Sequence, residues 1–230
     1  MSEFLENSVF FGAVISLMAY EAGLLLKRKF KLAVLNPLLI AILCVMGVLI
    51  VFHVDYDAYN EGGKYISYLL TPATVCLAVP LYQQLSLLKK NIKAVAAGIL
   101  AGVLASMVSV LLMAKLFGLS HEEYVTLLPK SITTAIGMGV SQELGGIATI
   151  TVAVIIITGV LGNMLADFVY KTARIEEPIA KGLALGTSAH AIGTARAMEL
   201  GQVEGAMSSL AIAVAGLLTV AAASVFAGFM

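Results

Sequence analysis

Residues 186–196 read Gly-Thr-Ser-Ala-His-Ala-Ile-Gly-Thr-Ala-Arg and lie between long apolar segments. The stretch combines the ionisable His190 and Arg196 with small and hydroxyl-bearing residues in a chain that is otherwise mostly hydrocarbon. Ionisable groups at membrane depth cost free energy, so they are functional candidates. Small residues beside them allow a helix or a ligand to approach the backbone closely. We therefore expect a binding site here, inside a helical membrane protein.

The composition supports a membrane protein. Of 230 residues, 60% are hydrophobic and 12% are charged, whereas soluble domains carry about twice that charged fraction. A transmembrane helix needs about 20 apolar residues. Charge-free runs of that length cover 32–52, 65–88, 94–114, 144–166 and 205–230. The sequence predicts an all-α, polytopic transmembrane helical bundle in the lipid bilayer of the inner or plasma membrane.

The net charge is zero, but the cations are unevenly distributed. Ten of the 14 lie in three clusters: Lys27, Arg28, Lys29, Lys31; Lys89, Lys90, Lys93; and Lys171, Arg174, Lys181. Clustered Lys and Arg in the loops of membrane proteins face the cytoplasm, so we expect the acidic residues 55–61 to face outward. The clusters are small and flank the apolar runs, which argues against a nucleic-acid partner.

Local signals place several helix boundaries. The pair Asn36-Pro37 predicts a capped helix start, because Asn accepts from free backbone amides and Pro fits the first turn. The alternative is a start near Lys31 with a kink at Pro37. Ser120 and Glu123 form a capping box that opens a short helix.

Three segments carry signs of interruption. Prolines at 72 and 80 remove two backbone donors from the segment 65–88. Residues 130–139 are polar and contain glycine, and 186–196 combine small residues with two ionisable ones. Continuous helices satisfy every backbone group in lipid, so such breaks occur where they are buried or line a cavity. We expect discontinuous helices at all three places.

An internal repeat is visible at an offset of 116 residues, which aligns 70–74 with 186–190. It predicts two structural repeats, 1–118 and 119–230, within one integrated membrane domain. Loop charges change sign between the halves, as inverted repeats of transporters require. Inversion needs an odd number of crossings per half, so four apolar segments per half fit only if one is re-entrant or if an extra crossing exists. The alternative is that all membrane spans resemble one another.

Three cations lie in or near the apolar segments, and each has two interpretations. Lys130 is an interfacial anchor or a point charge for an anion. His190 is a packing residue or a proton-coupling group, and it shares a helix face with Thr194. Arg196 pairs with Glu199 three residues on, or grips a substrate carboxylate with two parallel hydrogen bonds.

The predicted binding set joins these cations to hydroxyl groups beside the interruptions: Thr71, Thr74, Lys130, Ser131, Thr133, Thr134, Thr187, Ser188, His190, Thr194 and Arg196. Cations, hydroxyls and the amide ends of broken helices favour a small anion. The sequence contains no motif of a nucleophilic or metal-dependent active site. We expect neither enzymatic activity nor a catalytic residue, a metal or a cofactor.

Four motifs strongly resemble the LrgB/CidB family. They are LNPLL at 35–39, the segment 69–82, LPKSITT at 128–134, and 186–196 with the following 204–210. Two positions depart from the family pattern. Ala135 stands where a proline follows the Thr-Thr pair, and Ser188-Ala189 reverses the usual Ala-Ser order.

The resemblance implies two candidate functions. Plastid relatives are similar to glycolate/glycerate carriers, and bacterial members are linked to pyruvate movement. The first hypothesis is therefore a secondary transporter of small monocarboxylates, which are 2-hydroxy or 2-oxo acids. Antiholin-like members modulate murein hydrolase activity and lysis with an LrgA-type small membrane partner, which is the second hypothesis. Small-residue helix faces are also compatible with a homodimer.

Overall fold

The computed structural model describes residues 10–30 and 35–230. The sequence also predicts a first helix over about 7–27, and its residues 7–9 lie outside the described residues, as does the alternative helix start at Lys31. All regular structure in this part of the chain is helical, as predicted.

Two compact units divide the chain, Met1–Cys76 and Leu77–Met230. The first contains α2 (Phe11–Phe30), α3 (Pro37–Phe52), α4 (Tyr56–Ser67) and α5 (Leu70–Cys76). The second contains α6 (Ala78–Gln83), α7 (Leu85–Lys90), α8 (Ile92–Phe117), α9 (His121–Leu127), α10 (Thr134–Glu143), α11 (Ala148–Thr172), α12 (Pro178–Leu200) and α13 (Gln202–Ala227).

In the part of the chain that the structure describes, four helical segments are long and apolar enough to cross a membrane. They are Tyr56–Gln83, which joins α4 to α6, and the helices α8, α11 and α13. This confirms a polytopic helical membrane protein. The run 32–52 was expected to be a fifth crossing, but its helix α3 has 16 residues. A helix of that length spans about 24 Å, which is less than the hydrocarbon core of a bilayer.

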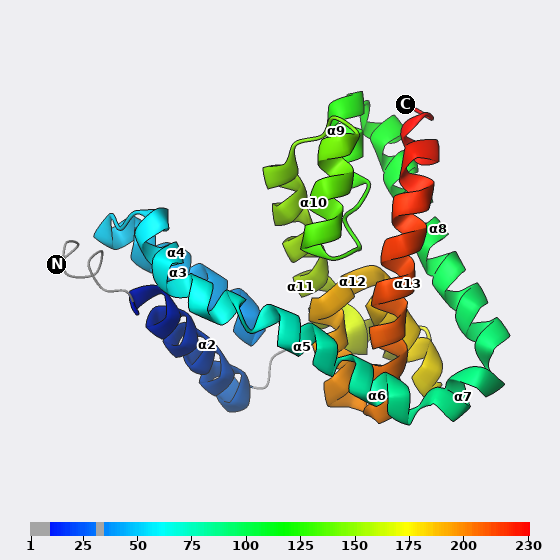
Figure 1. Cartoon of the computed structure of the whole chain (residues 1–230), viewed down its shortest axis with the longest axis horizontal. Helices are drawn as coiled ribbons and strands as arrows, with labels where there is room; N and C mark the ends of the chain where they lie inside the picture. The colour runs from blue at the N-terminus through cyan, green and yellow to red at the C-terminus, as the bar shows by residue number, and fades with distance from the viewer. Residues whose placement is uncertain (1–9, 31–34) are drawn as a thin grey trace. The chain divides into compact units, whose positions relative to one another are not determined.

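The first unit packs α2 against α3 and α4 (Figure 1). Its core is small, with Ala19 of α2 against Ala41 and Val45 of α3. The Asn36 side chain accepts hydrogen bonds from the amides of Leu38 and Leu39 at 2.9 and 3.3 Å. The predicted cap at Asn36-Pro37 is therefore confirmed.

In the second unit, α8 and α13 build most of the core. Val95, Ile99 and Met107 of α8 are buried, and the facing surface of α13 consists largely of alanines. Short side chains on α13 let neighbouring helices approach closely. The α8 glycines do the same toward α12, because Gly98 faces Leu183 and Gly102 faces Thr187.

Helix α12 breaks at His190 and folds back. The backbone there has φ 42° and ψ −134°, which is not helical. A Cβ atom on Gly193 would lie 2.6 Å from the carbonyl oxygen of Leu185, whereas residues eight apart in a continuous helix are separated by about 12 Å. The residues before and after His190 therefore form two arms of a hairpin, 178–189 and 191–200.

Helices α9 and α10 form a second hairpin. Ser120 and Glu123 make the predicted capping box at the start of α9. The chain turns at the tip, residues 128–133, and returns so that Gly137 faces the carbonyl of Pro129. The amide of Ile147 then donates to the Thr126 hydroxyl at 2.8 Å, which fixes the start of α11 beside α9.

The two hairpins enter the second unit from opposite ends. The starts of α8 and α12 line one common cleft, to which Asn91 and Glu177 both contribute. At the other end, the Tyr124 hydroxyl of α9 donates to the carbonyl of Phe226 near the end of α13, at 3.0 Å, and Figure 1 shows α9 beside the C-terminus. We call the first of these the basic end, because Lys89, Lys90, Lys93, Lys171, Arg174 and Lys181 flank the helices there.

Both hairpins meet α11 at one residue, Ile155. A Cβ on Gly137 would lie 2.5 Å from the Ile155 side chain, and the Ile155 carbonyl accepts a hydrogen bond from His190 at 2.9 Å. Ile155 is fully buried and lies in the second turn of α11. The two hairpins therefore meet α11 about 10 Å from the start of this 25-residue span.

Because α12 folds back at His190, we predict that a side chain larger than that of glycine does not fit at position 193. Gly193→Ala places a methyl group against the Leu185 carbonyl, which is backbone and cannot rotate away, so the free energy of unfolding should fall by about 1–3 kcal/mol. The matched control is Gly139→Ala, a helical position in α10 with no atom within 4 Å of the added Cβ. Denaturation of both variants in mixed micelles measures the difference. Equal stability of the two would contradict the hairpin.

Candidate functional site

A cleft of about 810 Å³ runs between α8 and the first arm of α12 in the second unit. The hydroxyl and cationic residues along it are Ser106, Ser109, Lys130, Ser131, Thr187 and Ser188. Its remaining lining is largely apolar, with Gly98, Gly102, Leu183 and several alanines. Among the predicted binding residues, the structure thus brings Lys130, Ser131, Thr187 and Ser188 to one cavity.

Lys130 lies at the tip of the α9–α10 hairpin. Its ammonium group donates to the hydroxyls of Ser131 at 3.1 Å and Ser106 at 3.4 Å, and Ser106 donates to Ser131 at 3.0 Å. Within residues 10–30 and 35–230, no carboxylate forms an ion pair with Lys130. A cation held only by hydroxyl groups retains most of its attraction for an anion.

The depth of Lys130 follows from its contact with Ser106. Ser106 is near the middle of the 26-residue α8, about 17 to 21 Å from its two ends at 1.5 Å per residue. The hydrocarbon core of a bilayer is about 30 Å thick, which places the Lys130 ammonium group near its centre. An ionisable side chain at this depth faces a bundle interior or a water-filled cavity.

The hydrogen-bond donors of the cleft are few. Thr187 and Ser188 donate to the carbonyls of Leu183 and Ala184 in their own helix arm, at 2.8 and 2.6 Å. Their hydroxyls therefore offer only acceptor lone pairs to a ligand. Ser131 accepts two hydrogen bonds, and its own proton remains to be donated. At the depth of Ser106, Lys130 and Ser131 are thus the two groups equipped to hold a carboxylate.

His190 lies at the tip of the α12 hairpin and is buried. Because a carbonyl oxygen only accepts, the Nε2 of His190 carries the proton that is donated to Ile155. Thr194 donates to the backbone carbonyl of His190 at 3.0 Å and lies 2.7 Å from the Ser208 hydroxyl of α13. These contacts hold the break between α11 and α13, and neither His190 nor Thr194 lines the cleft.

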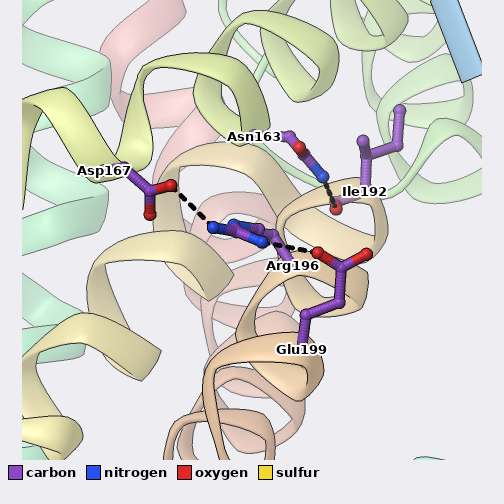
Figure 2. Close-up of polar contacts among 5 residues, drawn as sticks. All are labelled: Asn163, Asp167, Ile192, Arg196 and Glu199. Atoms are coloured by element: carbon purple, nitrogen blue, oxygen red, sulfur yellow. Dashed lines mark hydrogen bonds and ion pairs between the residues drawn. The ribbon is translucent and has the colours of Figure 1, made fainter. Parts of the chain in front are cut away.

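Arg196 lies on the second arm of the α12 hairpin and outside the cleft lining. Figure 2 shows it between Asp167 and Glu199. Its guanidinium group pairs with Glu199 at 2.5 Å, the partner that one sequence interpretation favours. It also pairs with Asp167 of α11 at 2.6 Å, which the sequence did not indicate. One turn before Asp167, Asn163 of α11 donates to the carbonyl of Ile192 at 3.0 Å. These contacts fix the second arm on α11.

The remaining predicted residues lie elsewhere. Thr133 precedes α10 and Thr134 begins it, and neither lines the cleft. Thr71 and Thr74 belong to α5 of the first unit, where Thr74 donates to the carbonyl of Leu70 at 2.8 Å. That these four hydroxyls join the binding site stays a prediction.

Two hydroxyl residues of the cleft, Ser106 and Ser109, were missed from sequence. A signal for the first was present, because Gly98, Gly102 and Ser106 recur at a spacing of four. Small residues at that spacing form one close-packing stripe of a helix. Gly98 and Gly102 leave room for the cleft because they lack side chains, and Ser106 at the end of the stripe adds a hydroxyl group to its lining.

The fold and cleft define a multi-pass helical membrane protein with two opposed hairpins. Comparison with known proteins gives the family: residues 16–229 match the LrgB-like family, and the chain belongs to it. The chain is 40% identical to the holin-like protein CidB of Staphylococcus aureus (strain Mu50) over 206 residues, 90% of each chain. It is also 40% identical to the antiholin-like protein LrgB of Bacillus mycoides (strain KBAB4) over 222 residues, 96% of each chain.

No solved structure matches the chain. The apolar spans and the bacterial relatives together establish a multi-pass protein of the cell membrane.

The strained backbone at His190 gives a prediction. A positive φ favours glycine and costs other residues about 1–3 kcal/mol. His190→Gly and His190→Ala both lose the hydrogen bond to Ile155, but only the alanine keeps the strain. We expect the glycine variant to have the higher free energy of unfolding. A more stable alanine variant would show that position 190 is helical.

Proposed function

We propose that this protein is a secondary transporter that moves a small monocarboxylate across the cell membrane, with no catalysis of its own. The observation that carries the proposal is the position of Lys130. Its ammonium group lies beside the middle of the membrane-spanning helix α8, and it contacts hydroxyl groups rather than carboxylates. An ammonium group and a free hydroxyl proton suit one carboxylate, and the lone pairs of Thr187 and Ser188 suit the hydroxyl of a 2-hydroxy acid.

The cleft supports a monoanion more than a dianion. Lys130 is the one cation of its lining within the described ranges, and Glu177 lies toward the opposite, basic end. A second carboxylate on the substrate would find no second cation in this lining and would be repelled by Glu177. The 2-hydroxy and 2-oxo acids implied by the family resemblance satisfy this limit.

The opposed hairpins suggest how access would alternate. Lys130 and Ser131 belong to one tip, whereas Thr187 and Ser188 belong to the arm of the other hairpin. Movement of one hairpin away from α11 would open the cleft toward one end of the bundle while the other stays seated. His190 and Arg196 would act as positioning residues that keep the α12 hairpin on α11. Alternating access by movement around a site at mid-depth is typical of secondary transporters.

A second candidate is antiholin-like regulation of murein hydrolase activity together with an LrgA-type small membrane partner. The names of the relatives, holin-like CidB and antiholin-like LrgB, support it more directly than they support transport. In this case the purified chain alone would show no saturable flux. The two candidates therefore differ in an observable property of the isolated protein.

Uptake by proteoliposomes tests the proposal. Lys130→Met keeps the length of the side chain and removes its charge, so the saturable uptake of labelled pyruvate or glycolate should fall at least tenfold. The matched control is Lys115→Met, the same change in the last turn of α8 and outside the cleft lining, which should retain uptake. Saturable uptake that survives Lys130→Met removes this site from transport. No saturable uptake by the unaltered chain favours the regulatory candidate.

A further inference from the structure

A second cavity of about 420 Å³ lies at the basic end of the second unit. It is formed where α11 ends and α12 begins, and it is separate from the Lys130 cleft because the two share no lining residue. Its cationic lining consists of Lys171, Arg174 and Lys181. Cavities of this size accommodate a small ligand or a headgroup.

The three cations of this cavity take part in no ion pair within the described residues. No ion pair joins Lys171, Arg174 or Lys181 to a carboxylate there. Two carboxylates also line the cavity, but Asp167 is paired with Arg196 at 2.6 Å. The lining thus carries three positive and two negative charges, a net charge of +1, and Asp167 shares Arg196 with Glu199.

Tyr170 positions one of these cations. Its hydroxyl donates to the backbone carbonyl of Lys181 at 2.9 Å, and the Lys181 ammonium group lies 6.0 Å from the centre of the Tyr170 ring. An aromatic face attracts a cation without neutralising it. Lys181 is therefore fixed at the cavity and keeps its full charge for a ligand.

Arg174 occupies a position that favours glycine. It follows α11 with φ 53°, and the amides of Arg174 and Ile175 donate back to the carbonyls of Lys171 and Tyr170. This is the hydrogen-bond pattern of a Schellman motif, whose left-handed residue is most often glycine. A strained arginine at a cavity points to a role for its guanidinium group, which binds phosphate oxygens in a bidentate manner.

The position of the cavity limits the ligand. Lys171 is in the last turn of α11, a membrane-spanning helix, so the cavity lies at the boundary between hydrocarbon and water. Phosphate groups of anionic lipids occupy this level, and basic pockets between transmembrane helices bind them. We propose that Lys171, Arg174 and Lys181 form a binding site for a phosphate ester, either an anionic phospholipid headgroup or a soluble phosphate ester.

The test uses the full-length protein in detergent and native mass spectrometry. Phosphatidylglycerol, cardiolipin and zwitterionic phosphatidylcholine are added separately, and glycerol 3-phosphate is added in a fourth sample. The triple variant Lys171→Gln/Arg174→Gln/Lys181→Gln removes the site. The matched control Lys89→Gln/Lys90→Gln/Lys93→Gln removes the same charge at the same end of the unit.

We expect the retention of anionic lipid or of glycerol phosphate to fall at least tenfold in the site variant and to stay within twofold in the control. Whichever of the two ligands is retained identifies its source. An equal loss in both variants, or no preference of the unaltered chain for either ligand over phosphatidylcholine, would overturn the proposal.

A single substitution distinguishes loss of ligand binding from misfolding. Arg174→Gly suits the left-handed backbone, so its melting temperature should equal or exceed that of the unaltered chain. Its retention of the phosphate ligand should nonetheless fall several-fold. A glycine variant that melts normally and binds normally would exclude the arginine from the site.

Discussion

The second unit depends on the contacts that Ile155 of α11 makes with the two hairpins. The side chain of Ile155 faces Gly137 in one hairpin, and the Ile155 carbonyl accepts the hydrogen bond from His190 at the tip of the other. A backbone that leaves helical geometry inside a membrane must find new partners for its polar groups. Here Asn163 of α11 donates to the carbonyl of Ile192, and Thr194 donates to the carbonyl of His190. Ile155 of α11 and Ser208 of α13 hold the side chains of His190 and Thr194. The break at His190 is stable because the neighbouring helices surround it.

This arrangement explains the polar residues of the stretch 186–196. Gly186 and Gly193 permit close approach to α13 and to the first arm of the hairpin. Thr194 and Arg196 tie the second arm to its neighbours, and Thr187 and Ser188 face the cleft. The polar residues thus divide into two groups, those that hold the hairpin and those that line the cavity. The sequence placed all of these polar residues in the predicted binding set, with packing as the alternative for His190 and pairing with Glu199 as the alternative for Arg196.

Much of the fold could be predicted from the sequence, because hydropathy and helix caps act locally. The long apolar helices, the Asn36 cap and the capping box at Ser120 follow from residue type and spacing. The pairing of Arg196 with Asp167 could not be predicted, since it depends on how α12 folds back over α11. The cleft position of Ser106 likewise depends on a tertiary contact, although its small-residue stripe was visible. The two repeats, 1–118 and 119–230, stay a prediction.

The most direct test of the central claim asks whether water and anions reach position 130 within the membrane. In a chain with Cys44→Ser and Cys76→Ser, the variant Lys130→Cys is treated in sealed vesicles with a negatively charged, membrane-impermeant thiol reagent. The account predicts that the introduced thiol is modified by the reagent from at least one side of the membrane. A thiol at position 130 that stays unmodified with the reagent on either side of the membrane would contradict it.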